Sequence, residues 1–456
     1  MRKIYTLLVF FLLVTAGRLS AQFTDLSAPF PPPSEDIGYM SVPSAGVIWA
    51  TGYASTTNQS FVRSADDGQT WIGDVVPTPT TLWDNTSIFA LDANTAWVTL
   101  VDRATGTLGA LYKTSNGGAS WVRQGTDSLF LDAALSFANW TYFWDANDGV
   151  TMGDAVGGYF EIWRTTDGGD NWSRVPQANI PPPLDAGEYG LADGYAAVGD
   201  TVWCTTRRGT CLRSIDRGQT WESFATGHTG YYNLYFHDAA HGLSVRRSAS
   251  TSANVFRSSS DGGATWSEPF TATVSDSMLG LVDAPFFMRH ADYVPGTSML
   301  VGVGRDPNSL VELAAVSYDE GHSFTSLGLA PEDFSYVQML STTTGYLGGS
   351  VGGIARVYQL DVALSGVREP LAATVPVKIL GNPAAGQLAV EVLEALGAQG
   401  ALTLFSIDGR QLYKIAAPFA LPGQQLQMPL SGFPAGFYLL QVHSNQGVFT
   451  AKVSVK

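Results

Sequence analysis

The 456-residue sequence is poor in positive charge, in cysteine and in long apolar segments. It has 25 Lys and Arg residues against 40 Asp and Glu residues, which gives a formal net charge of −15 at pH 7. A protein this acidic is a poor general binder of nucleic acid, because the phosphate backbone repels it. We therefore expect no nucleic-acid partner.

The one apolar run that approaches the length of a membrane span lies at the N-terminus. Arg2 and Lys3 precede this run, and the small residue Ala21 ends the segment. This order is typical of a secretory signal peptide. An uncleaved anchor is the alternative, but Arg18 interrupts the run too early for a span of about 20 residues. We predict a signal peptide over residues 1–21 and no transmembrane segment after its cleavage.

The sequence has two cysteines, Cys204 and Cys211, and they flank a predicted hairpin tip. The six residues between them allow the two side chains to face each other on paired strands. Because export places the chain in an oxidising compartment, we predict a disulfide between them. Two free buried thiols are the alternative.

Signals for metals and cofactors are also weak. No His or further Cys stands near the cysteine pair at the spacing of zinc ligands. His237 and His241 are four residues apart, but they belong to a predicted hairpin, so the helical rule does not bring them to one face. No phosphate-binding loop or dinucleotide fingerprint is present. We expect no metal and no cofactor.

The sequence does contain one octet six times, with the pattern Ser/Thr-x-Asp-x-Gly-x-Thr-Trp. Its third, fifth and eighth residues are Asp66, Gly68 and Trp71; Asn116, Gly118 and Trp121; Asp167, Gly169 and Trp172; Asp216, Gly218 and Trp221; Asp261, Gly263 and Trp266; and Asp319, Gly321 and Phe324. The Asp accepts backbone hydrogen bonds, the Gly permits a positive φ, and the aromatic ring packs against the body. Each octet is therefore predicted to be a self-satisfied turn with an apolar anchor.

The spacing of the octets predicts the architecture. Their aromatic anchors at residues 71, 121, 172, 221, 266 and 324 are separated by 50, 51, 49, 45 and 58 residues. This period, with 49 Gly, 23 Pro and 14% charged residues, favours an all-β chain of four-stranded propeller blades. A strand–turn–strand unit also recurs, at Phe89–Trp97, Phe143–Val150, Leu191–Tyr195, Phe236–Leu243 and Met339–Tyr346. Seven such units in all predict a seven-bladed β-propeller, with six or eight blades as alternatives.

Composition sets the expected boundaries. We predict a Pro-rich lead-in over 22–35, the propeller over 36–361, a linker over 362–374 and a small immunoglobulin-like β-sandwich over 375–456. A closed propeller leaves no exposed strand edge. The first strand, around residues 38–50, is therefore expected to complete the last blade.

The octets resemble the Asp-box, or BNR repeat, of sialidases, sortilin-type receptors, xyloglucanases and photosystem II assembly factors. In those families the box is a structural turn on the propeller rim, away from the ligand face. The resemblance implies a structural role for all six octets.

The tail resembles the type A C-terminal sorting domain of the type IX secretion system. The matching residues are Asn382, Pro383, Asp408, Gly409, Arg410, Gly436 and Tyr438. Leu380-Gly381 departs from the usual Tyr-Pro, and an ordinary accessory domain is the alternative. The resemblance implies a Bacteroidetes-type bacterium, recognition by the secretion machinery, and passage through the periplasm. It further implies tail removal, with release or attachment at the outer-membrane surface.

Catalytic signals are few. A sialidase needs convergent arginines, for which Arg207 and Arg289 are weak candidates with Arg246, Arg247 and Arg305, but the Phe-Arg-Ile-Pro block of that family is absent. A glycosidase needs two carboxylates, and Asp154 and Glu188 are weak candidates. The plainer interpretation makes Asp154 a strand end and Glu188 a solvated loop residue. Aromatic residues that would stack on sugars, or simply pack between blades, are Trp83, Trp140, Tyr231 and Tyr232.

From the sequence we expect a secreted or cell-surface, non-catalytic binding or scaffold module for a glycan or an envelope protein. The alternative is a secreted carbohydrate-active enzyme, a glycoside hydrolase or a sialidase-like one. An assembly factor for another envelope protein is a third possibility, suggested by the resemblance to the photosystem family.

Overall fold

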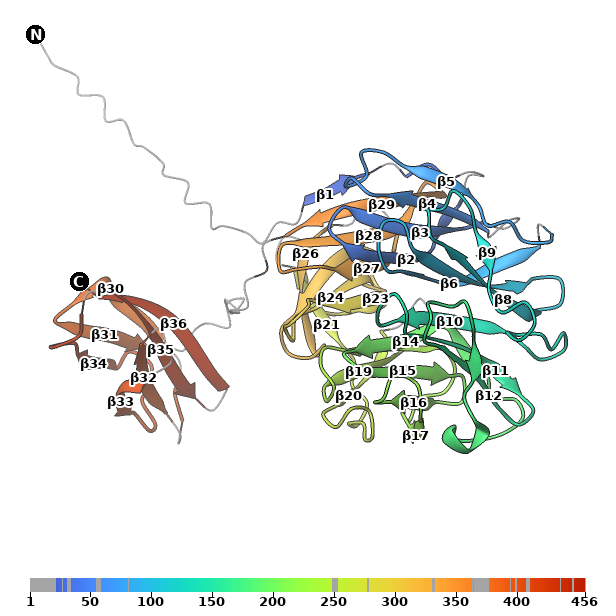
Figure 1. Cartoon of the computed structure of the whole chain (residues 1–456). Helices are drawn as coiled ribbons and strands as arrows, with labels where there is room; N and C mark the ends of the chain where they lie inside the picture. Colours follow the sequence, from blue (N-terminus) through green and yellow to red (C-terminus); the bar gives the residue numbers. More distant parts are fainter. Residues whose placement is uncertain are drawn as a thin grey trace, which may run out of the picture. The chain divides into compact units, whose positions relative to one another are not determined.

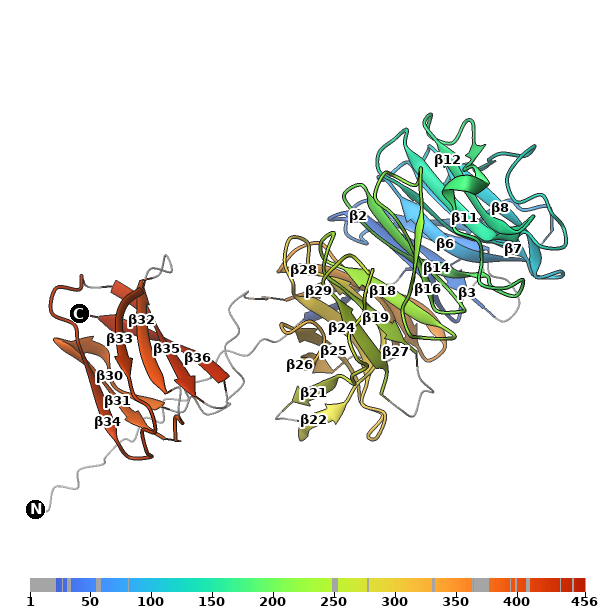
Figure 2. The ribbon, with the colours of Figure 1, turned by 90° about the horizontal axis from the view of Figure 1, so that it is seen from below.

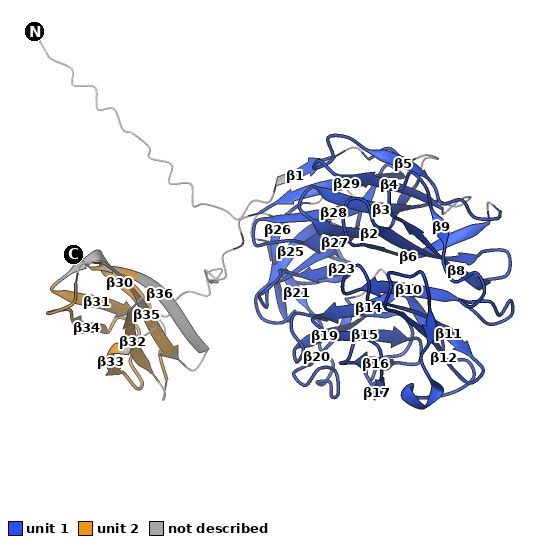
Figure 3. Cartoon of the chain, viewed as in Figure 1, with its two compact units in different colours: residues 1–366 blue, residues 367–456 orange. Residues whose placement is uncertain are grey.

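The computed structural model describes residues 22–26, 28–30, 34–54, 59–80, 82–247, 253–276, 279–329, 333–362, 364, 377–393, 395–397, 400–406, 411–434, 436–444 and 447–455. The chain divides into two compact units, residues 1–366 and 367–456 (Figure 3). The division falls inside the predicted linker. Residues 1–21 lie outside the described residues, so the signal peptide stays a prediction. No helix found in the described ranges has the length and apolar character that crossing a membrane requires.

The described strands of the first unit form seven sheets. The first four sheets are β2 (Asp36–Ser44), β3 (Val47–Tyr53), β4 (Ser60–Ser64) and β5 (Ile72–Val75); β6 (Trp83–Ala90), β7 (Ala96–Asp102), β8 (Thr107–Thr114) and β9 (Val122–Arg123); β10 (Ala138–Phe143), β11 (Gly149–Val156), β12 (Tyr159–Thr165) and β13 (Ser173–Arg174); and β14 (Gly190–Val198), β15 (Thr201–Thr206), β16 (Thr210–Ser214) and β17 (Glu222–Ala225). A short 3-10 helix, Gln177–Asn179, lies between the third and fourth sheets.

Three more sheets complete this unit. The fifth is β18 (Tyr232–Phe236), β19 (Gly242–Arg246) and β20 (Val255–Ser259); the sixth is β23 (Phe287–Tyr293), β24 (Leu300–Arg305), β25 (Glu312–Ser317) and β26 (Ser323–Leu329), extended by β21 (Thr273–Asp276) and β22 (Leu281–Pro285); the seventh is β27 (Asp333–Met339), β28 (Thr344–Val351) and β29 (Ile354–Asp361) with β1 (Gln22–Asp25). Each sheet is antiparallel apart from the parallel β21–β26 pair.

The first strands of successive sheets form a closed ring. Strands β2, β6, β10, β14, β18, β23 and β27 contact one another in that order, and β27 contacts β2. The sheets therefore follow one another round the unit in chain order, as the colours of Figure 1 show. Seen from below, β2, β6 and β14 lie close together (Figure 2). This ring confirms the predicted all-β propeller, and the number of sheets equals the number of repeated units in the sequence.

The ring closes with a different strand from the one expected. Strand β1 pairs antiparallel with β29, with Gln22 opposite Asp361, so the closing strand comes from the predicted lead-in. Residues 36–44 instead begin the first sheet. The prediction that residues 38–50 complete the last blade was therefore wrong. Phe23 anchors the closing strand, because its ring centroid lies 5.5 Å from that of Phe334.

Each octet is a turn that follows the third strand of its sheet, and in five of the six sheets it leads into the fourth strand. In the first octet, Gly68 N donates to Ser64 Oγ at 2.8 Å, and Thr70 N donates to Asp66 Oδ1 at 2.8 Å. The bonds to Thr70 lower the pKa of Asp66. The same pattern recurs at Asn116, Asp167, Asp216, Asp261 and Asp319. The fifth residue of every octet has a positive φ, from 76° to 96°. The octets therefore satisfy backbone donors of their own turns with their own side chains.

The predicted disulfide between Cys204 and Cys211 was wrong, because both cysteines are free and buried. Cys211 lies opposite Thr205 on paired strands, and Cys204 lies opposite Leu212. Neighbouring residues of a strand point to opposite faces, so the two thiols point away from each other and cannot be bridged. Cys204 Sγ lies 3.2 Å from Met152 Sδ, and burial raises the pKa of Cys211 to about 12.

The described residues of the second unit form seven strands. They are β30 (Val377–Ala385), β31 (Gln387–Val392), β32 (Ala401–Ser406), β33 (Gln411–Ala416), β34 (Gln425–Pro429), β35 (Gly436–Ser444) and β36 (Gly447–Val455), in the order β33-β32-β35-β36-β30-β31-β34. Strand β30 pairs antiparallel with β31 and parallel with β36, and so joins the two halves of the sheet. Leu388, Leu402 and Leu440 are fully buried in its core. The immunoglobulin type of this unit stays a prediction.

Candidate central binding site

The inner strands of the propeller enclose two adjoining cavities. The larger, of about 580 Å³, is called here the central cavity. The side chains that matter most in its lining are those of Tyr39, Tyr231, Arg247, Arg289, Arg305 and Tyr336. The smaller cavity, of about 270 Å³, shares Asp193, Asn233, His290 and Tyr336 with it. Residues far apart in the sequence therefore meet in one place.

The arginines of the central cavity differ in their partners. Arg289 makes a bidentate ion pair with Glu312 and a further bond of 3.0 Å to Asp333. Arg305 lies 3.7 Å from Glu312. Arg247 donates to the backbone carbonyl of Arg289 at 3.2 Å and makes no ion pair within the described part of the chain. The guanidinium of Arg247 is therefore the one best able to receive an anion.

A half-buried pair lies beside these arginines. The Tyr336 hydroxyl donates to the Asp193 carboxylate, and the His290 ring stacks on Tyr336 with centroids 4.0 Å apart. Burial raises the pKa of Asp193 to about 7, although the Tyr336 bond and Arg247 oppose this rise. Burial lowers the pKa of His290 to about 3, so this ring is neutral at pH 7.

Of the four weak catalytic candidates, Arg289 alone lines the central cavity. Asp154 accepts bonds from Asn139 Nδ2 at 2.8 Å and from Gly190 N at 3.0 Å, and burial raises its pKa to about 7. Arg207 lies over the Tyr189 ring, 5.5 Å from its centroid. Asp154 and Arg207 thus have local partners outside both cavities.

Glu188 is buried and not the solvated loop residue that was expected. It is 3% exposed. Its carboxylate accepts bonds from the backbone N–H of Leu184 and from the hydroxyls of Thr206 and Thr210. These bonds occupy both oxygen atoms of the Glu188 carboxylate and hold the loop before β14 in place. The arrangement suits a structural carboxylate.

The four aromatic candidates for sugar stacking also fall into two groups, buried and exposed. Trp83, Trp140 and Tyr232 are buried, so they pack between blades. Tyr231 is 61% exposed and lines the central cavity. Its carbonyl accepts a 3.1 Å bond from the Arg247 N–H, which holds the two residues side by side.

Sequence reasoning missed Asp193 and Tyr336. The segment Leu191–Tyr195 was predicted to contain a tight turn, but it lies within β14, and the turn to β15 comes at residues 199–200. Asp193 has a φ of 52° and falls where the β14–β15 register shifts. The bulge directs this side chain into the cavity. An Asp-Gly pair inside an apolar run suggests a bulge as well as a turn.

The sorting-domain residues are described in part. Asn382 and Pro383 belong to β30, and Gly436 begins β35. Asp408, Gly409 and Arg410 lie outside the described residues. The Tyr438 hydroxyl donates to the Pro434 carbonyl at 2.7 Å, and its ring packs edge-on against Phe433.

Comparison with known proteins identifies the tail. Residues 378–456 match the family described as the secretion system C-terminal sorting domain. No curated protein matches the chain. Similar solved structures include YCF48 bound to D1 peptide (17% identity, TM-score 0.47, covering 76% of this chain and 96% of that one). Another is YCF48 from Cyanidioschyzon merolae (12%, 0.46, 75% and 98%).

A mutant of Trypanosoma rangeli sialidase displaying trans-sialidase activity is also similar, with 11% identity, a TM-score of 0.38, and coverage of 93% of this chain and 83% of that one. Likeness at this level says nothing about ligand or reaction. The sorting domain indicates export through the type IX secretion system, to the cell surface or beyond it. The chain is a β-propeller with Asp-box turns that ends in a secretion system C-terminal sorting domain.

Proposed function

We propose that the exported propeller is a non-catalytic binding module that takes an acidic glycan in the central cavity. The observation that carries the proposal is Arg247, which lines the cavity and has no ion pair within the described residues. A guanidinium is suited to bidentate recognition of a carboxylate. Tyr231, held beside Arg247 by a backbone bond, offers an exposed ring for a sugar face.

The charge balance supports an anionic ligand. The chain as a whole carries a formal charge of −15, yet three arginines line one cavity. Arg289 is already paired with Glu312 and Asp333. Its guanidinium therefore contributes mainly to the electrostatic potential of the cavity. Arg247 is left to make the direct contact. A charge pair in a partly enclosed site is stronger than one in open water.

Binding of glycans by the purified full chain, followed by isothermal titration calorimetry, tests the proposal. Uronic-acid and sialylated oligosaccharides should bind, and neutral oligosaccharides of equal length should not. Arg247→Gln should weaken binding at least about tenfold, equivalent to about 1.4 kcal/mol. Arg207→Gln is the matched control, because Arg207 lies outside both cavities. Equal binding by the two variants, or binding of an acidic peptide alone, would overturn the acidic-glycan proposal.

A glycoside hydrolase is the second candidate, and the Tyr336–Asp193 pair favours it. A tyrosine beside a carboxylate is a usable nucleophile–base arrangement. However, burial raises the pKa of Tyr336 well above its usual range, which holds the hydroxyl protonated. Reducing-sugar release from the same glycans, abolished by Tyr336→Phe, would establish the enzyme. Binding without release supports the binding module.

A further inference from the structure

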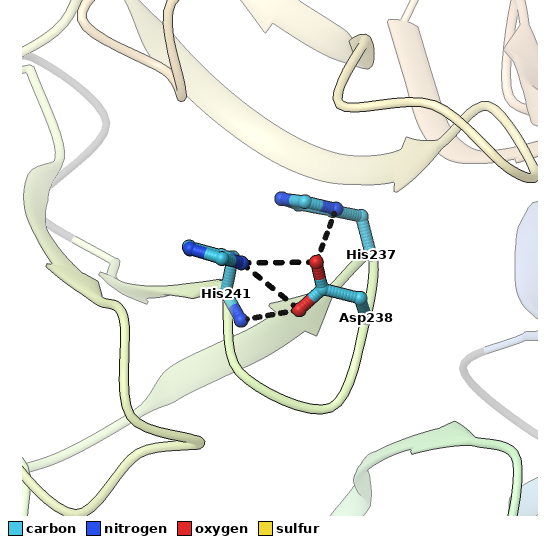
Figure 4. A group of neighbouring side chains, drawn as sticks. All are labelled: His237, Asp238 and His241. Atoms are coloured by element: carbon cyan, nitrogen blue, oxygen red, sulfur yellow. Dashed lines mark hydrogen bonds and ion pairs between the residues drawn. The ribbon is translucent and has the colours of Figure 1, made fainter.

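The turn between β18 and β19 carries three side chains with metal-ligating atoms. They are His237, Asp238 and His241, and one ligand atom from each lies within 4.8 Å of the others (Figure 4). We expected that the two histidines, on a hairpin rather than a helix, would not share a face, and this expectation was wrong. The two rings are stacked, with centroids 5.4 Å apart and planes 8° from parallel.

The propeller repeats this turn, and the copies show which groups the backbone needs. In the second sheet, Asp92 Oδ1 accepts bonds from Asn94 N and Thr95 N, and in the third sheet Asp145 Oδ1 accepts from Asn147 N and Asp148 N. One carboxylate oxygen thus builds the turn in these two copies, and in the seventh sheet the Ser341 hydroxyl does so, accepting from Thr343 N and Thr344 N.

The fifth sheet follows the same rule. Asp238 Oδ1 accepts from Ala240 N at 2.7 Å and from His241 N at 2.6 Å. The positions of His237 and His241 are occupied in the second sheet by Leu91 and Thr95, whose backbone bond matches that between His237 N and His241 O. The imidazoles are therefore not required by the turn.

The second oxygen of Asp238 faces both rings. Asp238 Oδ2 lies 2.9 Å from His241 Nδ1 and 3.5 Å from His237 Nδ1. Zinc bonds of about 2.0–2.2 Å hold adjacent ligand atoms about 3.3 Å apart in a tetrahedral site. The two distances lie on either side of this value. One ligand atom of each residue lies within 4.8 Å of the others, so rotation of the imidazoles out of their stacked arrangement would bring the three atoms onto one ion.

The surroundings of these three side chains favour a bound cation and leave the site accessible to solvent. The side chains of Asp238 and His241 are 48% and 43% exposed, and that of His237 is 13% exposed. The Tyr293 ring packs edge-on against His237 and fixes its plane. The Asp238 carboxylate places a negative charge next to both imidazole rings. The site is thus negatively biased and open to water.

We propose that His237, Asp238 and His241 form a surface site for a divalent transition metal, Zn²⁺ in the first place, with water completing the coordination. Imidazole and carboxylate ligands suit Zn²⁺, and Cu²⁺ and Ni²⁺ compete for such donors. The ion would clamp the β18–β19 turn, because both histidines flank it.

Calorimetric titration of the purified full chain with ZnCl₂ tests this site. One zinc ion should bind, and His241→Ala and His237→Ala should each weaken binding at least about tenfold. Asp238→Asn keeps an acceptor for the turn but removes the anionic ligand, so it should weaken zinc binding while circular dichroism stays unchanged. His322→Ala is the matched control, because His322 lies in a neighbouring turn and bonds only the Asp319 carbonyl there.

Zinc should also raise the melting temperature of the unaltered chain and not that of His241→Ala, since a ligand bound only by the folded state stabilises it. His241 is partly exposed, so its removal leaves the fold intact and keeps the result interpretable. No zinc binding by the unaltered chain would overturn the proposal. Undiminished binding by the His237→Ala/His241→Ala double variant would overturn it as well.

Discussion

The hydroxyl of Tyr336 donates a hydrogen bond to the carboxylate of Asp193, although 143 residues separate the two in the sequence. Tyr336 lies on β27 and Asp193 on β14, which are inner strands of different sheets. The bond therefore joins sheets that are not neighbours in the ring. The centre of the propeller is held by a half-buried polar pair as well as by apolar packing.

Replacing Tyr336 by Phe should destabilise the propeller. The half-buried Asp193 carboxyl group would lose its side-chain donor, which costs about 1 kcal/mol. The free energy of unfolding from urea denaturation measures this loss. Tyr318→Phe is the control, because Tyr318 is partly buried and has no hydroxyl bond within the described residues. Equal losses in the two variants would contradict a role for the Tyr336–Asp193 bond.

The stability of the chain should depend on pH through Asp193. Its pKa is about 7 in the folded protein against 3.8 for an ordinary Asp, because burial disfavours the charged form. Between these values the folded state binds more protons than the unfolded state, so this group lowers stability as pH rises from about 4 to about 7. Asp193→Asn removes the titration. Its stability relative to the unaltered chain should therefore increase with pH across this window.

Urea denaturation of both proteins at several pH values from 4.5 to 7.5 measures the effect. The difference between the two proteins isolates Asp193 from other buried groups. Asp292 acts in the same direction, whereas His290, with a pKa lowered to about 3, acts in the opposite one. Asp170→Asn, at an exposed position, is the control substitution of the same chemical kind. A constant difference for Asp193→Asn would contradict the prediction.

Gly118 of the second octet should tolerate a side chain less well than the turn glycine Gly157. A Cβ added at Gly118, where φ is 89°, would lie 2.5 Å from the Phe61 ring of the preceding sheet. Gly157 has a φ of 72°, but a Cβ there meets nothing within 4 Å. Gly157→Ala should cost about 1 kcal/mol from backbone strain, and Gly118→Ala about 1–3 kcal/mol more from overpacking. Similar unfolding free energies for the two variants would show that the octets do not set the contact between sheets.

The octets made the fold predictable because each one closes its hydrogen bonds within a few residues. The bond from Gly68 N to Ser64 Oγ spans four residues, so the local sequence determines it. The central cavity depends on pairs such as Tyr336 and Asp193, which no local pattern joins. The turn was predicted within residues 191–195 but lies at residues 199–200, and this error of a few residues placed Asp193 in a turn. Likewise, an offset of one residue between β15 and β16 separates Cys204 from Cys211.

That offset leads to a test of the thiols. The side chains of Cys204 and Cys211 point to opposite faces of their sheet and both are buried. Without any reductant, the full chain should show no thiol reactive toward Ellman's reagent when folded and two when unfolded in guanidinium. A reducing agent should leave the melting temperature unchanged, because there is no disulfide whose reduction would increase the conformational entropy of the unfolded chain. Unfolded protein without reactive thiols would mean that the two cysteines are bridged, and the register of β15 and β16 would then have to differ from the one described.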